Sequence, residues 1–372
     1  MTDPLTLAKA LIDAPSVTPA RGQVFDVLEA ALIAQGFAVE RFIAGEAPDG
    51  PVENLLATRG DDSGAHIGFA GHLDVVPPGP DWRSDPFVAV ERGGRLYGRG
   101  AVDMKGAIAA FVAAAASAPR RGRITLIITG DEEGPAVHGT RALIERMRAR
   151  GLVPDFCLVG EPTSATMLGD TIKIGRRGSV TLQLAVGGVQ GHVAYPQLAD
   201  NPIPALLRIL TAIEAIELDT GRHWFQPSNI EITSIDVGNA ATNVIPAAAS
   251  ARISVRFNDL HRGQAIIDRI AAVVATEPNA RLEGRISGEA FLTAPGPLSA
   301  LVADAVSEVT GLTAELSTSG GTSDARFLVA LCPVIEFGLP NATMHKRDES
   351  VAVADLRQLT AIYAAVLRRA LD

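Results

Sequence analysis

Apolar and polar positions follow two different patterns along the chain. Residues 66–70 and 124–129 are almost continuously apolar, which is typical of strands that helices cover on both faces. Residues 104–116 and 142–150 predict helices, and residues 156–159 predict a further short strand. This alternation of strands and helices predicts an α/β layer with a mostly parallel sheet.

From about residue 179 onward, apolar residues alternate with polar ones, as in strands with one exposed face. Three such strands are predicted, with apolar positions Val180, Leu182, Leu184 and Val186, then Ile230 and Ile232, then Ile253, Val255 and Phe257. Two helices are also predicted, the first with Leu206, Ile209, Leu210 and Ile213 and the second with Ile266, Ile270 and Val273. With a last strand at 280–286, the order matches the ferredoxin-like βαββαβ unit.

The domain organisation follows from where these patterns change. Apolar helices and strands resume from Pro297 to Leu371, so the βαββαβ unit is inserted into the α/β layer. A chain of 372 residues is also too long for one ordinary core. We therefore expect a discontinuous α/β domain of residues 1–177 and 291–372, and an inserted α+β domain of residues 178–290.

Composition excludes several classes of protein. Hydrophobic residues make up 47% and charged residues 20% of the chain, which allows large cores and argues against disorder. No apolar stretch reaches the roughly 18 residues of a membrane span. The net charge of −9 disfavours binding to nucleic acid through its phosphates. We expect a small-molecule substrate, and neither a nucleic acid nor a membrane as partner.

Two features predict a cytoplasmic location. Cys157 and Cys332 both lie in apolar contexts, which indicates buried free thiols in a reducing compartment. The N-terminal segment has Thr2 and Asp3 as potential caps and Pro4 in a first helical turn, and charged residues interrupt its apolar face. This pattern predicts a surface helix rather than a signal peptide.

Five potential metal ligands lie in short motifs rich in Gly, Pro or acidic residues. They are His72 in GHLDVVP, Asp103 in GRGAVDMKG, Glu133 in TGDEEG, Glu161 in GEPT and His345 in TMHKRDE. Two imidazoles and three carboxylates are what two zinc ions sharing a bridging carboxylate need. All but Asp103 follow apolar strand-like runs, and active sites of α/β sheets lie at the carboxyl ends of strands. The pattern predicts a metal site, and a two-metal hydrolase if these side chains converge.

Each ligand also has an ordinary alternative. His72 could satisfy a loop, and Asp103 could cap the helix that follows it. Glu132 and Glu133 could be solvated, although adjacent residues point differently, so that one could bind metal while the other faces the substrate. Asp74 lies two residues after His72 and could accept a hydrogen bond that fixes the imidazole tautomer.

Taken together, the motifs resemble those of the M20 family of metallopeptidases and amidohydrolases, over essentially the whole chain. GHLDVVP, GRGAVDMKG and DEEG resemble the wider family. Five further motifs resemble one branch of the family in particular, the branch that hydrolyses succinylated diaminopimelate. They are KIGRRGS, GHVAYPQLADNP, ATNVIP, STSGGTSDARF and EFGLPNATMHKRDE. The resemblance implies a zinc-dependent amidohydrolase that converts N-succinyl-LL-2,6-diaminopimelate to succinate and LL-2,6-diaminopimelate in lysine biosynthesis.

The resemblance also implies roles at the metal centre. Two Zn²⁺ ions per subunit are expected, with Co²⁺ as an alternative metal. The ligands would divide between two sites, with Asp103 in both, His72 and Glu161 in one, and Glu133 and His345 in the other. Glu132 would be the general base, and Asp74 would support His72.

For the inserted domain, the resemblance implies a dimerisation and lid role. It would form a homodimer interface and deliver His192 to the partner's active site. Positions that match substrate-binding residues of the family are Arg176, Ser179, Tyr195, Asn243, Arg256, Gly321, Thr322 and Asn341. Thr242 departs from some relatives, which carry Asn there, and this puts only a secondary contact in doubt.

Two rival functions stay open at this point. Another M20 enzyme, such as an acetylornithine deacetylase, an aminoacylase or a carboxypeptidase, would share the metal ligands but not the GRRGS and STSGGTSD contexts. A non-catalytic metal-dependent binding protein would lack Glu132 or a ligand, and none is missing. No GxGxxG follows the first strand, which disfavours a nucleotide-dependent oxidoreductase.

Overall fold

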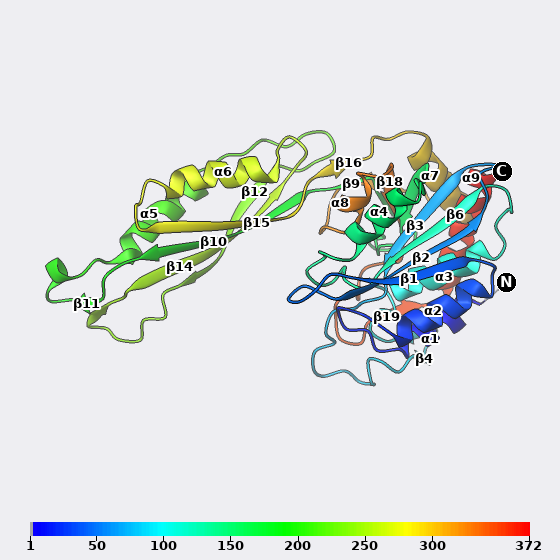
Figure 1. Cartoon of the computed structure of the whole chain (residues 1–372), viewed down its shortest axis with the longest axis horizontal. Helices are drawn as coiled ribbons and strands as arrows, with labels where there is room; N and C mark the ends of the chain where they lie inside the picture. Colours follow the sequence, from blue (N-terminus) through cyan, green and yellow to red (C-terminus); the bar gives the residue numbers. More distant parts are fainter. Residues whose placement is uncertain (1–2) are drawn as a thin grey trace. The chain divides into compact units, whose positions relative to one another are not determined.

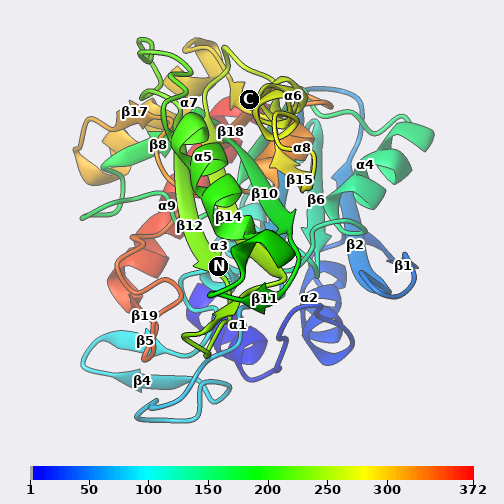
Figure 2. The same ribbon diagram turned by 90° about the vertical axis from the view of Figure 1, so that its left-hand side faces the viewer.

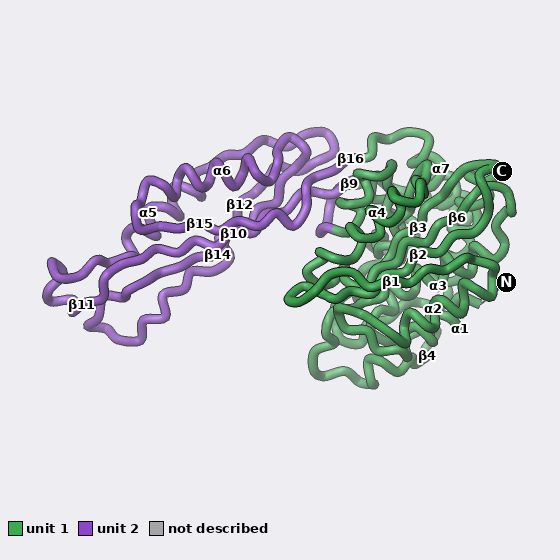
Figure 3. Tube along the Cα trace, in the orientation of Figure 1, with its two compact units in different colours: residues 1–174, 293–317, 323–372 green, residues 175–292, 318–322 purple. Residues whose placement is uncertain are grey.

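A computed structural model describes residues 3–372, and the chain divides into two compact units (Figure 3). Unit 1 contains the residues up to Ile174 together with Thr293–Ser317 and Ser323–Asp372, and unit 2 contains Gly175–Leu292 and Thr318–Thr322. The expected domain bounds differ from these units mainly at residues 318–322, which return to unit 2. Independent folding of each unit stays a prediction.

Unit 1 is built on an eight-stranded sheet with the strand order β1-β2-β6-β3-β7-β18-β8-β17 (Figure 1). The strands are β1 (Ala38–Ala44), β2 (Val52–Gly60), β3 (His66–His72), β6 (Arg123–Thr129), β7 (Phe156–Val159), β8 (Thr171–Lys173), β17 (Glu315–Ser317) and β18 (Val334–Glu336). The central strands, from β6 through β3 and β7 to β18, are parallel, whereas β1 and β2 add antiparallel strands at one edge. The predicted α/β layer with a mostly parallel sheet is confirmed.

Helices cover both faces of this sheet. They are α1 (Pro4–Ile12), α2 (Gln23–Ile33), α3 (Lys105–Ala115), α4 (Thr140–Ala149), α7 (Pro297–Thr310), α8 (Ala325–Leu328) and α9 (Val353–Leu371). The helices α3 and α9 pack on β3 from one face, and α4 packs on β6 and β2 from the other (Figures 1 and 2). Because both faces are covered, every residue of β6 after Arg123 is buried, which explains the continuous apolar run in the sequence.

An aromatic cluster joins the two parts of the sequence that make up unit 1. Phe69 on β3 stacks on Phe111 of α3 with ring centroids 3.9 Å apart, and Tyr363 of α9 meets both rings edge-on at 5.7 Å. The Tyr363 hydroxyl donates a hydrogen bond to the backbone oxygen of Phe337, after β18. Stacked and edge-to-face rings stabilise one another beyond their burial, so this cluster fastens the returning C-terminal segment to the N-terminal half.

A small antiparallel sheet has the strand order β19-β5-β4, formed by β4 (Val90–Arg92), β5 (Arg95–Tyr97) and β19 (Ser350–Ala352). Its pairing continues past the strand ends, because the Gly98 amide donates to the backbone oxygen of Glu349 at 3.0 Å. The ladder therefore holds the segment after His345 beside the GRG loop that precedes Asp103.

Unit 2 contains an antiparallel sheet with the order β12-β14-β10-β15, and α5 and α6 pack on one of its faces. Its main elements are β10 (Gly178–Gly187), α5 (Pro202–Glu214), β12 (Asn229–Asp236), β14 (Ala248–Phe257), α6 (Gly263–Val274) and β15 (Ala280–Gly288). Buried and exposed residues alternate along β10 and β14, as predicted, and the βαββαβ order is confirmed. In α6 the predicted Ile266 and Ile270 are buried, Val273 is partly buried against the same core, and Val274 is buried as well.

Short elements complete unit 2, namely β9 (Gly175–Arg176), β11 (Gly191–His192), the 3-10 helix η1 (Pro196–Leu198), β13 (Val244–Ile245) and β16 (Phe291–Leu292). In unit 1, the predicted N-terminal helix is present, with Pro4 in its first turn and the Asp3 side chain accepting a hydrogen bond from the Leu5 amide. The other potential cap, Thr2, lies outside the described residues. Among residues 3–372, no helix is both long and apolar enough to cross a membrane.

The aromatic cluster generates a stability prediction. Phe111→Ala should lower the free energy of unfolding by about 3–5 kcal/mol, because it removes a buried ring and leaves a cavity. Urea unfolding followed by circular dichroism measures this change. Ile33→Ala on α2, where the side chain is 56% exposed, should change stability by only about 0.5 kcal/mol or less. Similar losses in the two variants would contradict the role given to the cluster.

Candidate metal centre

The candidate ligands lie where neighbouring strands of unit 1 end. His72 is the last residue of β3, while Glu132 and Glu133 follow β6 and Glu161 follows β7. Since β6, β3 and β7 are adjacent and parallel, their carboxyl ends open at the same edge of the sheet. Asp103 precedes α3 at this edge, and His345 arrives on the segment that precedes β19.

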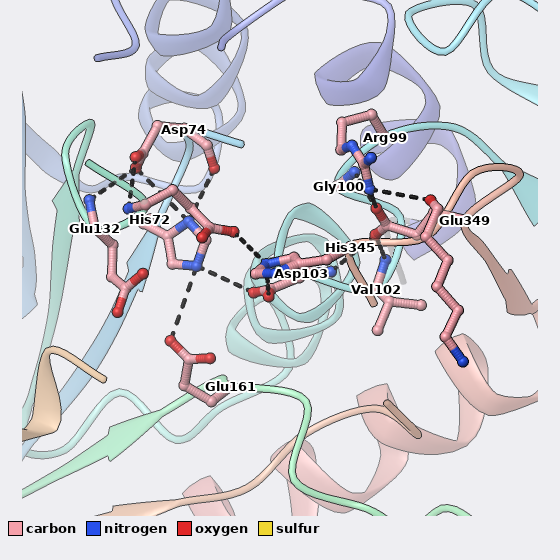
Figure 4. A network of polar contacts seen from close by, with 12 residues as sticks. His72, Asp74, Arg99, Gly100, Val102, Asp103, Glu132, Glu161, His345 and Glu349 are labelled. Carbon is pink, nitrogen blue, oxygen red and sulfur yellow. Dashed lines mark hydrogen bonds and ion pairs between the residues drawn. The ribbon is translucent and has the colours of Figure 1, made fainter. Parts of the chain in front are cut away.

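All five predicted ligands converge, and Figure 4 labels four of them, His72, Asp103, Glu161 and His345. Asp103 lies between the two imidazoles, with Oδ1 3.2 Å from His72 Nε2 and Oδ2 3.1 Å from His345 Nε2. Glu161 Oε1 lies 3.8 Å from His72 Nε2, and Glu133 Oε1 lies 2.8 Å from His345 Nε2. Two donors bound to one tetrahedral zinc at about 2.0–2.1 Å are roughly 3.3 Å apart. The four observed donor–donor distances, from 2.8 to 3.8 Å, lie on either side of this value. The donor atoms and their spacing are therefore compatible with zinc.

Glu132 faces the same space as the ligands. Its carboxylate and the donor atoms of His72 and Glu161 lie within 4.8 Å of one another, and a second group within that distance is formed by His72, Asp103 and Glu133. Glu132 is therefore close enough to the candidate ligands either to bind a metal ion with them or to act on a water molecule at the centre, as a general base must.

The predicted hydrogen bond between the His72 imidazole and the Asp74 carboxylate is not formed. His72 Nδ1 instead contacts the backbone oxygen of Asp74 at 2.9 Å, while the nearer carboxylate oxygen lies at 3.6 Å. The strand ends at His72, so the alternation of side chains does not extend to Asp74. The carbonyl nevertheless fixes the tautomer that leaves Nε2 for a metal.

The Asp74 carboxylate binds backbone amides instead of the imidazole. It accepts hydrogen bonds from the backbone amides of Glu132 at 3.1 Å and Glu133 at 2.9 Å. Its burial raises the pKa of Asp74 to about 6, although the nearby His72 and these amides lower it. Asp74 thus anchors the turn that carries the candidate base and one candidate ligand.

The alternative role of Asp103 as a helix cap is not observed. Met104 occupies the position before α3, and no side chain caps the helix there. Met104 packs beneath the strand ends, since a Cβ added to Gly71 or Gly160 would lie 2.7 Å from its Cε atom. The two glycines directly before His72 and Glu161 therefore leave room for this side chain.

The charges at the centre require positive charge between them. Burial, followed by the neighbouring Glu161 carboxylate, raises the pKa of Glu132. Burial alone would also raise the pKa of Asp103, but hydrogen bonds from His345 and His72 lower it. Hydrogen bonds from His345 to Asp103 and Glu133 raise the pKa of His345 to about 10. Carboxylates and imidazoles gathered in this way bind divalent cations in competition with protons.

Two charged residues that support the centre were not predicted from the sequence. The Glu349 carboxylate accepts hydrogen bonds from the Val102 and Asp103 amides and from the Arg99 guanidinium. Both residues lie inside motifs that also contain ligands, GRGAVDMKG and TMHKRDE. A charged residue between motif glycines, and an acid directly before an apolar strand, were the signals that could have identified them.

Unit 2 gathers one group of the predicted substrate-binding residues. Arg256 on β14 donates to the Ser179 hydroxyl of β10 at 2.6 Å, and the two residues are paired across the strands. The Arg176 side chain reaches the backbone oxygen of Ser319 at 3.4 Å. A Cβ at Gly320 would lie 2.6 Å from Arg176 Nη1, so glycine is needed for this close approach. The neighbouring Gly321 and Thr322 belong to the same unit.

A second group lies at the other end of unit 2. His192 on β11 pairs with Val244 on β13, and the Val193 amide donates to the backbone oxygen of Asn243 at 3.1 Å. The Tyr195 and His192 rings have centroids 5.8 Å apart. Since β13 leads into the start of β14 and Arg256 lies near the end of that strand, a single chain does not bring His192 to Arg256.

Asn341 belongs to unit 1, whereas the two groups of substrate-binding residues described above belong to unit 2. Its backbone amide donates to the Ser164 backbone oxygen at 3.0 Å, and Pro340 and Ser164 form an isolated bridge. Asn341 is therefore held against the GEPTS segment that carries Glu161.

Comparison with known proteins identifies the family. The model of peptidase family M20/M25/M40 matches residues 68–369, which is most of the chain. The chain belongs to this family. It is 67% identical over 371 residues to a succinyl-diaminopimelate desuccinylase from Sphingopyxis alaskensis, covering 99% of this chain and 98% of that protein. A protein of the same name from Rhizorhabdus wittichii is 62% identical and covers 100% of this chain and 99% of its own length.

Solved structures of M20 proteins share the fold. A metallo-carboxypeptidase of the family from Sulfolobus solfataricus has a TM-score of 0.80 at 15% identity, with 99% of each chain covered. A dinuclear metal-binding M20 peptidase from Bacillus subtilis has a TM-score of 0.72 at 15% identity, covering 100% of this chain and 98% of its own. The M20 fold is thus present over the full length of the chain.

The convergence on Asp103 predicts its effect on metal binding. Asp103→Asn should weaken zinc binding to metal-stripped protein by about 100-fold or more, because a neutral amide replaces the carboxylate between the two histidines. Isothermal titration calorimetry measures this loss. Asp62→Asn, at a side chain that is 84% exposed, is the matched control and should bind zinc like the unaltered protein. Equal binding by Asp103→Asn and the control would exclude Asp103 as a ligand.

Proposed function

We propose that the chain hydrolyses N-succinyl-LL-2,6-diaminopimelate to succinate and LL-2,6-diaminopimelate, a step of lysine and diaminopimelate biosynthesis. The observation that carries this proposal is the identity of 67% to a desuccinylase over almost the whole chain. The convergence of two imidazoles and three carboxylates adds a physical reason, since these groups can hold two metal ions.

Zinc is the metal that the donor set fits, with two ions per subunit and Co²⁺ as an alternative. His72 and Glu161 would hold one ion, Glu133 and His345 the other, and Asp103 would bridge them. When bound, such a pair lowers the pKa of a water molecule and polarises a carbonyl group. The M20 protein from Bacillus subtilis is a dinuclear metal-binding peptidase, in agreement with this stoichiometry.

The chain's own residues would then move the proton. Glu132 would take a proton from the attacking water and return it to the leaving amine, a role commonly worth about 10²–10⁴-fold in rate. Asp74 would keep the backbone of Glu132 in place, because its carboxylate accepts hydrogen bonds from the amides of Glu132 and Glu133. His192 would donate a hydrogen bond to the oxyanion that develops on the amide carbonyl.

Substrate selection is assigned to the arginines of unit 2. The substrate carries three carboxylates, and guanidinium groups bind carboxylates through two parallel hydrogen bonds. Arg176 and Arg256, with Ser179 beside them, would bind these groups. Within the same chain, Gly321, Thr322 and Asn341 are proposed to complete the substrate site. Tyr195 and Asn243 lie beside His192, and they would reach the site together with it.

A homodimer is proposed because His192 lies far from this arginine group within one chain. Ser179 lies at the start and Gly187 at the end of the ten-residue strand β10, which at about 3.3 Å per residue spans roughly 30 Å. The apolar side chains next to His192, namely Val193, Tyr195 and Leu198, are exposed. A second copy that covered them could bring its own His192 to the active site, by the reciprocity of a two-fold interface.

A cytoplasmic location is proposed for the same protein. Cys157 and Cys332 are both buried and free, and burial raises the pKa of each thiol. Protonated, unpaired thiols are typical of proteins from reducing compartments.

Replacing the proposed base tests the mechanism. Glu132→Gln should keep zinc binding and lose turnover by about 10²–10⁴-fold, because the amide cannot accept the proton. Metal content and hydrolysis of succinyl-diaminopimelate are measured on metal-stripped protein before and after zinc is added. Loss of one zinc in this variant would make Glu132 a ligand, and near-normal turnover would remove it from the mechanism.

The same assay tests the substrate. Acetylated and succinylated amines are compared at equal concentration, because only the succinyl group supplies a third carboxylate for the arginines. A strong preference for the succinylated amine is expected. Equal turnover of both would contradict the proposed substrate, while the metal centre itself would remain supported.

Mixing two inactive variants tests the homodimer. A heterodimer of one Glu132→Gln chain and one His192→Ala chain has one active site with both residues intact, so it should show about half the turnover of the unaltered dimer. Two different affinity tags isolate this heterodimer, and the two homodimers serve as controls. A heterodimer no more active than its parents would contradict the delivery of His192 by a partner.

A further inference from the structure

Glu349 is placed at the metal centre by the small sheet of unit 1. It directly precedes β19, and its backbone oxygen accepts a hydrogen bond from the Gly98 amide at 3.0 Å. This pairing fixes the residue opposite the loop that runs from Arg99 to Asp103. The Glu349 side chain is fully buried, which is costly for a carboxylate unless hydrogen bonds compensate it.

The compensation comes from the loop that carries Asp103. Oε1 accepts from the Val102 amide at 2.8 Å and from the Asp103 amide at 3.1 Å, while Oε2 accepts from the Gly100 amide at 3.2 Å and from Arg99 Nη1 at 2.7 Å (Figure 4). Both carboxylate oxygens are therefore bound to groups of one loop. Hydrogen bonds to an ionised acceptor are stronger than those between neutral groups, so Glu349 fixes the backbone of the loop from Arg99 to Asp103.

Arg99 extends this contact to two further segments, one beside His345 and one that follows β3. Its guanidinium donates to the backbone oxygen of Lys346, next to His345, and to that of Pro78, both at 3.2 Å. It also lies over the Trp82 ring, 5.1 Å from the centroid. The buried pair of Glu349 and Arg99 thus links the loop before Asp103, the turn after His345 and the segment that follows β3.

The contacts of Glu349 and Arg99 fix the backbone of Asp103, the candidate ligand that lies between the two imidazoles. Both carboxylate oxygens of Asp103 approach imidazoles, at 3.2 and 3.1 Å, so a shift of the Asp103 backbone would lengthen one contact as it shortened the other. A buried ion pair is not needed for stability alone, since apolar residues of similar volume often stabilise a fold as well. Apolar residues could not bind the amides of Val102 and Asp103.

We propose that Glu349 and Arg99 are positioning residues that set the place of the Asp103 carboxylate and thereby the affinity of the centre for its two metal ions. The inference rests on the proposed function, because it takes the converging side chains as metal ligands. Neither residue contacts the metals or the substrate in this proposal. Their effect is transmitted through the backbone of Asp103.

The test compares two buried glutamates. Glu53 is also buried and accepts hydrogen bonds from an arginine, Arg41 Nε at 2.8 Å, and from a backbone amide, Gly22 at 2.7 Å. Neither of these partners is a candidate ligand or adjoins one in the sequence. Glu53→Gln therefore matches Glu349→Gln in chemistry and burial but not in its connection to the metal centre.

Three measurements are made on metal-stripped protein: zinc affinity by competition with a chelator, urea unfolding, and amide hydrogen exchange of residues 98–104. Glu349→Gln should bind zinc about 10–100-fold more weakly, as is typical when a residue that supports a metal ligand is changed. The Val102 and Asp103 amides should also exchange faster. Glu53→Gln should keep zinc affinity within about twofold while losing comparable stability to urea.

Arg99→Lys provides a second variant, which keeps the charge but loses the planar fork that reaches three segments. It should also weaken zinc binding, and it replaces Glu349→Gln if that variant does not fold. Unchanged zinc affinity in the folded Glu349 or Arg99 variant would overturn the proposal. A loss equal to that of Glu53→Gln would do so as well, because it would reflect general destabilisation.

The unaltered protein separates this outcome from a failure of the proposed function. If metal-stripped protein neither binds zinc nor gains hydrolysis of succinyl-diaminopimelate when zinc is added, the function itself is contradicted. If it does both and the Glu349 and Arg99 variants bind zinc equally well, the positioning role alone is contradicted.

Discussion

Buried carboxylates that lie side by side repel one another unless positive charge lies among them. Unit 1 brings Asp103, Glu132, Glu133 and Glu161 to one edge of its sheet, with the buried Asp74 behind them. The imidazoles of His72 and His345 donate hydrogen bonds to Asp103 at this edge, and these bonds lower the pKa of Asp103. Much of the surrounding structure can be understood as the means of holding these acids together.

The parallel sheet meets this constraint through its register. His72 is paired with Thr129, and Ala70 with Val159, so β3, β6 and β7 end at nearly the same level. Ligands that follow these strands need no long loops to reach one another. His345 comes from the other side of the inserted unit, and the contacts among Phe69, Phe111 and Tyr363 keep its segment in unit 1.

Sequence patterns predicted the elements and the ligands because both depend on local rules. Burial on two faces requires continuous apolar runs such as 124–129, and burial on one face requires alternation such as that around Val180. Most of the ligands were recognisable because they lie at or soon after the end of an apolar run, whereas Asp103 follows a Gly-rich turn. Local rules did not predict that Asp74 binds the amides of Glu132 and Glu133, since that contact depends on where β3 ends relative to the next turn.

The contacts of Glu349 were beyond sequence reasoning for a related reason. Its partners lie about 250 positions away in the chain, from Arg99 to Asp103, and only the β19–β5 ladder brings them together. A buried charge is visible in a sequence as an ordinary polar residue. Its burial, and the backbone groups that satisfy it, are properties of the assembled fold.

The candidate sites of the two units carry opposite charges, arginines in unit 2 and carboxylates in unit 1. The proposed substrate and metal ions would neutralise both. In the described part of the chain, Arg256 donates hydrogen bonds only to Ser179, Ser254 and Val255, none of them acidic. Burial, followed by the nearby Arg177, lowers the pKa of Arg256. Unit 1, in contrast, holds an excess of carboxylates. In the proposed function, a substrate with three carboxylates would neutralise the arginines of unit 2, and two divalent cations would neutralise the carboxylates of unit 1. Under that proposal, selectivity for an acidic amide and dependence on metal would both follow from charge neutralisation, applied to each unit separately.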